Sequence, residues 1–428
     1  MRKLISRLST FLLAPAGAAL ALATAMPATQ ALAQAPVPPS QDPFYTYSGA
    51  TPLGQIAPGT VLAKRSISVT IASLSVPVSA EQLLYRTTGE QGQATATVTT
   101  VIRPLLSLGS PRIVSFQTAY DALGSQCDPS YTLQGGNSGD TVAQAEAAEI
   151  AVYVVAGFTV TVPDYEGENL DWGAGQESGY GTLDAIRATE SYLHAGSGTK
   201  AGMLGYSGGA IATEWASELA PSYAPSLHIV GAAAGGVPVD FAHNLTYING
   251  DQDWAGVIPA VLVSLGRAFG VDLTPYLSAY GQQVTSQVSG ECIASFAASY
   301  PGLTIQQLLG AQYQNPFTIP VLVTILNKLI MGTGGTPAEP VLLGVGNADG
   351  TGDGIMIAGD VEALAHEYCQ RGVPVSFDVY PLLQHTPAAV PFETHALTFL
   401  EGLFAGSAAP NGCSAIGTGN SLAPLPQP

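Results

Sequence analysis

A serine flanked by glycines carries the strongest chemical signal in the sequence. It is Ser207, in the run Gly205-Tyr206-Ser207-Gly208-Gly209, with an apolar stretch before it and helical spacing after it. This G-x-S-x-G pattern is typical of a nucleophile elbow, in which a strand turns sharply into a helix. The glycines let strand and helix approach around a strained residue, and the Gly208 amide can donate to an oxyanion. The stretch predicts a nucleophilic serine, although a plain Gly/Ser turn also matches so short a pattern.

A nucleophilic serine needs a base that accepts its proton. In folds with such an elbow the chain order is Ser, then Asp or Glu, then His, each in a loop after a later strand. His385 follows the last predicted strand, 375–380, where the base is expected. His366 and His395 lie inside predicted helices, and His243 lies far upstream. Position therefore favours His385.

Two aspartates follow the predicted strand 340–346, and either can be the acid that orients the base. Counting from the strand favours Asp349, whereas counting back from the next helix favours Asp353. We expect Asp349, with Asp353 as the alternative. The loop also resembles a calcium-binding loop in part, with Asp360 at its last position. That position normally holds a glutamate and no helix precedes the loop, so we expect no metal site.

Acyl transfer also needs a second backbone donor for the oxyanion. It should come from the loop after the predicted strand 112–117, where Asp121 is the best-placed polar residue. A helix N-cap is the purely structural alternative for Asp121, and a backbone donor role is compatible with it.

The elements that position these residues predict an α/β fold. Residues 66–104 read as antiparallel strands, and strands then alternate with helices as far as residue 235, which indicates a mostly parallel sheet flanked by helices. Residues 236–339 show only helical patterns, so we expect an inserted helical cap or lid there. Its helices are predicted at 255–269, 273–288, 292–300, 305–312 and 319–330. The sheet resumes in residues 340–428, which also include a last helix predicted at about 391–404 and a C-terminal tail. Residues 34–65 are rich in proline and polar residues and predict an extended N-terminal segment.

The first 33 residues predict a secretory signal peptide rather than part of the fold. Arg2, Lys3 and Arg7 precede an uncharged, Ala- and Leu-rich stretch at 11–25, and small residues follow. No later stretch is apolar enough for a membrane span. We expect a protein that is secreted or retained in the periplasm.

The composition favours a large apolar core and excludes nucleic acid as a partner. Apolar residues make up 46% of the chain and charged residues only 10%, which argues against disorder. The formal net charge of −18 repels polyanions.

Several separate segments together resemble the secretory lipase family of lipase A type. They are GYSGGA with TEWA, SFQTAYDALGSQCDPSY, VPDYEG with GTLDAIRA, PVLLGVGNAD and VYPLLQH. The resemblance spans residues 66–413. It implies an α/β-hydrolase fold with a helical cap inserted before the acid-bearing strand, activity on acylglycerols and other carboxylic esters, and no cofactor.

The resemblance also implies roles for individual residues. Ser207 takes the nucleophile position and His385 the base position, while Asp121 and Gly208 take the oxyanion positions. The DGTGDG loop is longer than the usual acid turn of the family, so the choice between the two aspartates stays open.

Four cysteines predict two disulfides in an exported protein, because their number is even. Their spacing alone leaves three pairings open. The resemblance implies Cys127 with Cys292, which would tie core to cap, and Cys369 with Cys413.

Together these features predict an exported serine hydrolase acting on carboxylic esters, a lipase or esterase. A peptidase or amidase with the same triad is the first alternative, and a non-catalytic binding protein on a hydrolase fold is the second. The few charges in residues 236–339 favour an ester with an apolar acyl group over a peptide. We expect a small-molecule or lipid ester as the partner, transient contact with a lipid interface, and a monomer.

Overall fold

The structure of the chain is a computed structural model, and it describes residues 35–71, 74–106, 109–196 and 198–428. The predicted signal peptide, residues 1–33, lies outside the described residues.

A nine-stranded sheet forms the centre of the fold, in the order β1-β4-β5-β7-β6-β8-β9-β10-β11. The strands are β1 (Val61–Ile67), β4 (Val78–Thr88), β5 (Ala94–Pro104), β6 (Ile113–Gln117), β7 (Thr159–Pro163), β8 (Lys200–Tyr206), β9 (His228–Gly235), β10 (Val341–Asn347) and β11 (Val375–Pro381). In the order of the sheet, each neighbouring pair from β1 to β7 is antiparallel, and each neighbouring pair from β7 to β11 is parallel. The prediction of a mostly parallel sheet is confirmed.

The first strand begins earlier than the sequence indicated. Strand β1 starts at Val61, inside the segment predicted to be extended, and ends at Ile67. After β1, Thr70–Ile71 (β2) and Leu74–Ser75 (β3) form a short antiparallel pair. The edge position of β1 explains the difference, because edge strands tolerate exposed charges that obscure an alternating apolar pattern.

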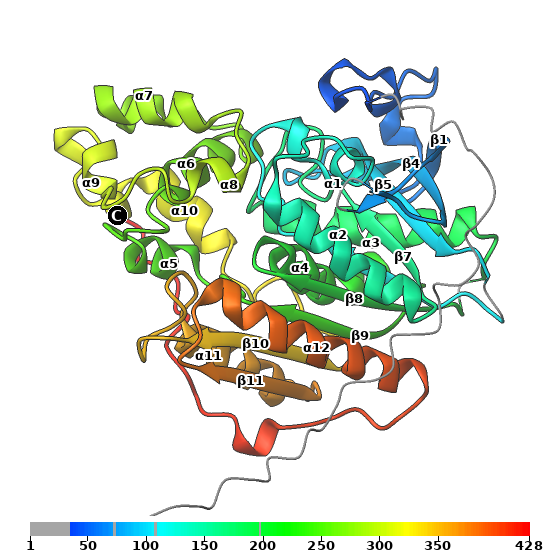
Figure 1. Cartoon of the computed structure of the whole chain (residues 1–428). Coiled ribbons are helices and arrows are strands. Elements are labelled where there is room, and N and C mark those ends of the chain that lie inside the picture. Colours follow the sequence, from blue (N-terminus) through cyan, green and yellow to red (C-terminus); the bar gives the residue numbers. More distant parts are fainter. Residues whose placement is uncertain (1–34, 72–73, 107–108, 197) are drawn as a thin grey trace, which may run out of the picture. The chain divides into compact units, whose positions relative to one another are not determined.

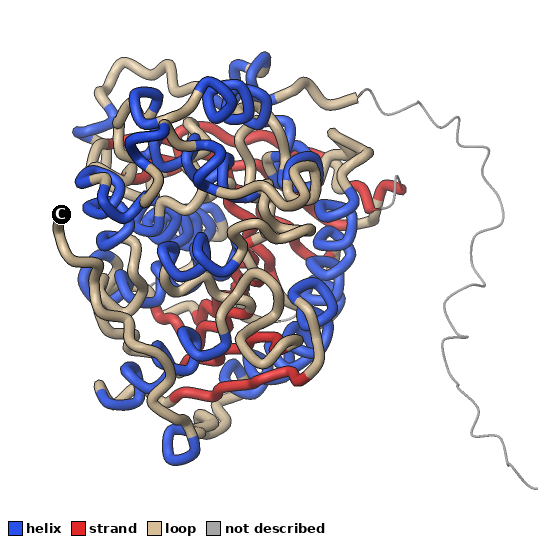
Figure 2. The backbone as a smooth tube through the Cα atoms, turned by 90° about the vertical axis from the view of Figure 1, so that its left-hand side faces the viewer, coloured by secondary structure: helices blue, strands red, loops and turns tan. Residues whose placement is uncertain are grey.

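Helices cover both faces of the sheet. On one face lie α2 (Thr141–Val155) and α12 (His385–Phe404), and on the other lie α3 (Gly175–Tyr192), α4 (Gly208–Tyr223) and α11 (Ala358–Gln370). Consecutive strand residues face opposite layers: Met203 packs with α4 and α11, and Leu204 packs with α12. Figure 2 shows the strands in the interior with helices outside them. A short helix, α1 (Pro129–Thr132), follows β6.

Six helices lie between β9 and β10 and gather at one end of the sheet, in the upper left of Figure 1. They are α5 (Phe241–Tyr247), α6 (Val257–Ala268), α7 (Ala279–Val288), α8 (Ile293–Phe296), α9 (Ile305–Leu308) and α10 (Pro320–Lys328). Most are shorter than the sequence pattern predicted, and α5 was not predicted as a separate helix. Proline and glycine between the apolar runs end the helices early.

The strand order reverses beside β6. The chain passes from β6 to β7 on one side, and then crosses to β8 on the other side. In open α/β sheets, the loops that leave two such strands diverge and form a crevice at their carboxyl ends. The loops after β6 and β8 contain Asp121 and Ser207, so the topology brings these two predicted residues together.

Candidate active site

Ser207 occupies a strained turn between β8 and α4. Its φ is 56° and its ψ is −122°, a conformation that a non-glycine residue rarely adopts. The flanking glycines are needed for space: a Cβ on Gly205 would lie 2.1 Å from Gly209 O, and one on Gly209 would lie 2.0 Å from Gln117 O. The Ser207 amide donates to Gly235 O over 2.8 Å. The turn therefore presents the serine hydroxyl at the carboxyl end of the sheet.

His385 lies against the serine and is held from several sides. Its Nε2 is 2.8 Å from Ser207 Oγ, and its Nδ1 is 2.8 Å from Asp353 Oδ2. Its side chain is 4% exposed, and its carbonyl accepts a hydrogen bond from Tyr206. His385 is the first residue of α12, whereas the sequence pattern placed the start of this helix near Pro391. In the tautomer with a proton on Nδ1, Nε2 is free to accept the serine proton.

The carboxylate beside His385 belongs to Asp353, not to the expected Asp349. Asp353 is fully buried, and its Oδ1 accepts from the amides of Ile355 and Met356. Asp349 is exposed and accepts a hydrogen bond from Tyr247 over 2.9 Å. The preference for Asp349 is therefore corrected in favour of the alternative.

The path of the loop explains this correction. Ala348 N donates to Gly352 O, and Gly352 forms an antiparallel bridge with Ile357, so the chain doubles back on itself after β10. This turn leaves Asp349 at its outer tip and returns Asp353 to the sheet. Of the two ways of counting, the count back from the following helix, which favoured Asp353, was therefore the more informative.

The loop does not form a calcium site of the kind that its spacing suggested. The Asp353 carboxylate already contacts His385 and two backbone amides. Asp360 contacts His243 and Asn420 instead of the loop. Among the described residues, no three His, Cys, Asp or Glu side chains form a group suited to a metal ion.

The side chain of Asp121 lies directly against Gly208, and these are the two residues whose amides are predicted to hold the oxyanion. Asp121 has a φ of 38°, and a Cβ on Gly208 would lie 1.5 Å from Asp121 Oδ1. The Asp121 side chain is 2% exposed, and its Oδ1 has no hydrogen-bond partner. Burial raises the pKa of Asp121 to about 7, although His385 and Trp172 act in the opposite direction. The carboxyl group is thus close to its titration point at neutral pH.

Ser207 and Gly208 border a small apolar cavity of about 40 Å³. About half of its wall comes from α5, α6 and the loop that follows Asp353, with Phe241, Leu245 and Val261 among the lining residues. A larger hollow of about 530 Å³ lies between residues 39–46 and the loops after β6 and β7, and none of the predicted triad residues lines it. The chemistry, rather than the volume, identifies the smaller cavity as the candidate active site.

Two disulfides join distant parts of the chain in the pairing that the family resemblance implies. Cys127, after β6, is bonded to Cys292, which precedes α8, and Cys369 of α11 is bonded to Cys413 near the C-terminus. The first links the loop region after β6 to the segment between β9 and β10.

Sequence reasoning missed three side chains around the site. Trp254 places its ring edge-on to His385, with ring centroids 5.4 Å apart, and Trp172 and Asn244 line the cavity beside Ser207. Asn244 is a lone amide in a largely apolar wall, but the apolar pattern around it in the sequence gave no sign that it faces a cavity.

Comparisons with known proteins agree with this geometry. The profile of the secretory lipase family matches residues 134–412. Lipase A of Arthroderma benhamiae is 32% identical over 96% of this chain and 89% of its own length. A probable inactive lipase of Mycobacterium tuberculosis is 32% identical over 85% of this chain and 82% of its own length.

The fold also matches a solved structure closely. The X-ray structure of Candida antarctica lipase A superimposes with a TM-score of 0.81 and 30% sequence identity. The match covers 91% of this chain and 92% of that one.

Proposed function

The chain belongs to the secretory lipase family and is a carboxylic-ester hydrolase of the lipase or esterase type, and we propose that it cleaves its substrate through an acyl-enzyme on Ser207. The observation that carries the proposal is the continuous line from Ser207 Oγ through His385 to Asp353, with both contacts at 2.8 Å. Such a line gives a weak nucleophile both a base and an orienting acid.

In the proposed reaction, Ser207 Oγ attacks the acyl carbon while His385 Nε2 takes its proton. Asp353 stabilises the imidazolium and keeps its ring oriented. The amides of Gly208 and Asp121 donate to the oxyanion of the tetrahedral intermediate. His385 then returns the proton to the departing alcohol, and water releases the acid by the same steps in reverse order. No metal or cofactor takes part.

The direct test combines an active-site phosphonate with a chromogenic ester. We expect the wild type to be labelled once per chain and to hydrolyse p-nitrophenyl acetate, and Ser207→Ala to lose both properties. Ser222→Ala is the matched control, because Ser222 is exposed on the same helix α4 and its hydroxyl only contacts Leu219 O. Labelling that survives in Ser207→Ala would overturn the proposed nucleophile.

The same samples separate the rival functions. Turnover of an aminoacyl anilide in preference to the ester would favour a peptidase or amidase. A folded wild type that is neither labelled nor active would favour a non-catalytic protein, a relevant outcome because one relative is named as a probable inactive lipase.

We propose that residues 236–339 act as a cap over the site. The proposal is supported by the positions of α5 and α6, which supply much of the wall beside Ser207. Residues 66–235 and 340–428 would then form the two parts of the core. Limited proteolysis tests this: cleavage within the cap should leave a protected core that no longer hydrolyses esters.

We further propose export through the signal peptide at residues 1–33. The family is secretory, and two disulfides suit an oxidising compartment. In the described part of the chain, no helix is both long and apolar enough to cross a membrane. N-terminal sequencing of the exported protein would reveal the cleavage point.

Contact with a lipid interface is proposed for the surface next to His385. Leu382 and Val390 flank this residue in sequence and are 85% and 69% exposed. In a monomer these side chains would be free to touch an ester droplet. Leu382→Asp should then lower hydrolysis of emulsified tributyrin and leave hydrolysis of dissolved p-nitrophenyl acetate near the wild-type rate. Light scattering would check that the protein is monomeric.

A further inference from the structure

The loop after β6 holds the second proposed oxyanion donor in a strained conformation. Asp121 has a φ of 38°, in the left-handed region that a residue with a side chain rarely adopts. Such a conformation costs free energy, and it persists only where the surrounding contacts fix the chain. The position of the Asp121 amide therefore depends on what holds the residues beside it.

Hydrogen bonds fix this loop on both sides of Asp121. Near its start, the Ala119 amide donates to Glu146 Oε1 over 2.6 Å. Further along, the Leu123 amide donates to Glu291 O over 3.0 Å, and Glu291 belongs to the segment between β9 and β10. The short stretch between these two anchors has the strained residue at its centre.

Glu166 binds both chain neighbours of Asp121. Its Oε2 accepts from the Ala122 amide over 3.0 Å, and its own amide donates to the Tyr120 hydroxyl over 2.7 Å. Glu166 is fully buried in the loop after β7, the strand that pairs with β6, so the sheet fixes its place. It therefore restrains the backbone on either side of the strained residue.

From these contacts we propose that Glu166 is a positioning residue of the oxyanion hole, which holds the Asp121 amide where it can donate to the oxyanion. The inference rests on the proposed acyl transfer at Ser207 and adds a residue outside the triad. Glu166 is buried and does not border the cavity beside Ser207, so it acts through the loop and not on the substrate.

The role requires a hydrogen-bond acceptor and not a negative charge. Burial, and after it the nearby Asp121, raises the pKa of Glu166 well above its ordinary value, which favours the neutral carboxyl group. Glutamine is also neutral and has a carbonyl oxygen that can accept from the Ala122 amide. Methionine is unbranched and similar in length but lacks that oxygen. Glu166→Gln and Glu166→Met therefore separate the acceptor from the volume that the side chain fills.

The test measures kcat and KM for p-nitrophenyl acetate, per active site titrated with the phosphonate. In Glu166→Met we expect kcat to fall about 100-fold while KM stays near the wild-type value, because loss of one oxyanion donor lowers the rate by about 10²–10³. Glu166→Gln should restore most of the wild-type kcat. A loss of stability alone would lower the number of active sites and leave the kcat of each site unchanged.

A transition-state analogue gives a second readout of the same donors. Phenylboronic acid forms a tetrahedral adduct with a nucleophilic serine, and one of its oxygens takes the place of the oxyanion. Its inhibition constant should rise in Glu166→Met together with the loss of kcat, because the analogue depends on the interactions that stabilise the transition state.

Glu90→Met is the matched control. Glu90 is also a buried glutamate whose Oε2 accepts a backbone amide over 3.0 Å, but that amide belongs to Glu177 of α3 and not to the loop after β6. The control variant should keep both the kcat per active site and the affinity for phenylboronic acid.

Tyr120→Phe decides the matter if Glu166→Met does not fold. It removes only the hydroxyl that accepts from the Glu166 amide, and it should lower kcat about tenfold with KM unchanged, as expected for one lost hydrogen bond. In that case, a wild-type kcat in Tyr120→Phe overturns the positioning role.

Failure of this role is distinguishable from failure of the proposed function. A folded Glu166→Met with the wild-type kcat, or a Glu166→Gln as slow as Glu166→Met, overturns the positioning role and leaves the ester hydrolase standing. If the wild type neither hydrolyses the ester nor is labelled at Ser207, the proposed function itself fails.

Discussion

At the residue scale, the partner of His385 has the clearest consequence for catalysis. Asp353 is buried and contacts the imidazole, whereas Asp349 lies at the exposed tip of the loop. Asp353→Asn should favour the wrong tautomer of His385 and lower kcat by about 10⁴-fold, as loss of the acid does in other triads. Asp349→Asn is the matched control and should stay within a few-fold of wild type. The kcat for p-nitrophenyl acetate decides between them, and the opposite ranking would return the role to Asp349.

The raised pKa of Asp121 predicts that kcat falls at alkaline pH. Its carboxyl group has a pKa of about 7 because it is buried, so it is neutral below that pH and negative above it. A negative charge beside Gly208 repels the oxyanion, which raises the barrier for acyl transfer. The kcat should therefore fall as the pH rises through about 7.

Asp121→Asn tests this reading, because asparagine keeps the backbone amide and the size of the side chain and cannot ionise. The variant should lose the decline in kcat above pH 7. A decline that persists unchanged in the variant would show that another group limits the rate.

The individual residues differed in how far the sequence could predict them. Ser207 and His385 were expected where the structure places them, because their positions follow from the order of strands and turns. The sequence did not decide between Asp349 and Asp353 as the acid. The chain doubles back after β10 through hydrogen bonds such as Ala348 N to Gly352 O, which the spacing of residues does not encode. Asn244 was missed because its position in the cavity wall depends on how α5 packs against the rest of the site, which spacing does not encode.

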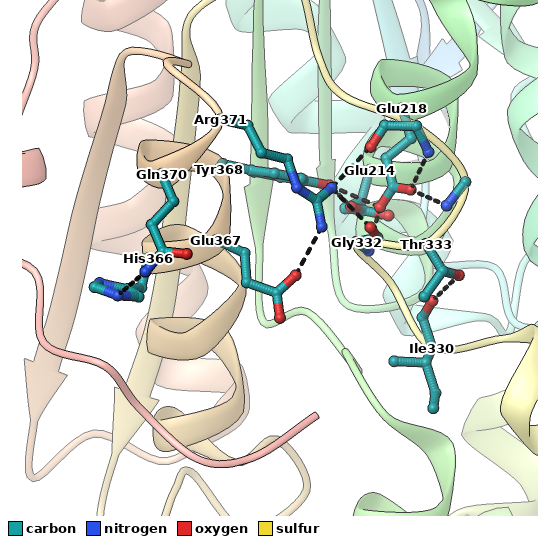
Figure 3. Close-up of polar contacts among 12 residues, drawn as sticks. Glu214, Glu218, Ile330, Gly332, Thr333, His366, Glu367, Tyr368, Gln370 and Arg371 are labelled. Atoms are coloured by element: carbon teal, nitrogen blue, oxygen red, sulfur yellow. Dashed lines mark hydrogen bonds and ion pairs between the residues drawn. The ribbon is translucent and has the colours of Figure 1, made fainter. Parts of the chain in front are cut away.

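At the element scale, helix α4 holds the segment that leads from α10 into β10. Glu218 of α4 is 1% exposed and accepts from the amides of Gly332, Gly334 and Gly335 (Figure 3). Tyr368 of α11 donates to the same carboxylate over 2.8 Å. The buried Glu218 side chain thus binds the end of the proposed cap to α4, the helix that begins directly after Ser207.

Glu218→Ala should therefore be strongly destabilising. It leaves three amides without their acceptor, whereas the Tyr368 hydroxyl keeps Glu214 as a partner. Each buried unsatisfied group costs about 1–3 kcal/mol. We expect the free energy of unfolding, from urea denaturation, to fall by more than about 3 kcal/mol.

Glu367→Gln is the control for this change. Glu367 is 37% exposed and pairs with Arg371 on the surface of α11, as Figure 3 also shows. Exposed ion pairs contribute about 0–1 kcal/mol, so this variant should remain near wild type. Equal effects of the two substitutions would contradict the role given to Glu218.

The sequence predicted the elements of the core better than those of the insertion. Strands β6, β7 and β10 are short runs of mostly apolar or β-branched residues and are buried along almost their whole length, as is typical of a parallel sheet covered on both faces. In the insertion the apolar spacing continued past the real helix ends, so α8 and α9 are each a single turn. Pro391 also misled the prediction, because proline is typical of a first helical turn, yet α12 contains it in its interior.

At the scale of the whole molecule, many carboxyl groups are buried. Burial raises the pKa of five of them to about 7: Glu90, Asp121, Asp164, Glu190 and Glu339. It raises the pKa of others well above the ordinary value: Glu146, Glu166 and Glu214. Only surface groups such as Asp349 shift in the opposite direction. A net charge of −18 shows that acids dominate, but it does not show which acids are buried.

These groups make the folded state more stable in mild acid than at alkaline pH. In the unfolded chain they titrate near pH 4, and in the folded protein near pH 7 or above. Between these values the folded state binds more protons, so raising the pH through about 4 to 7 lowers the free energy of unfolding. The Tm from calorimetry should be several degrees higher at pH 5 than at pH 8. A Tm that is constant or rises over this range would contradict the prediction.

Glu339 shows how one group contributes to this effect. It is 4% exposed, and its Oε1 accepts from Ser217 of α4. A pKa raised from 4.5 to about 7 corresponds to about 3 kcal/mol of stability that is present in acid and lost as the pH rises. Glu339→Gln imitates the protonated form, so it should match the wild-type Tm near pH 5 and exceed it at pH 8. If the variant tracks the wild type at every pH, the loss of stability arises elsewhere in the molecule.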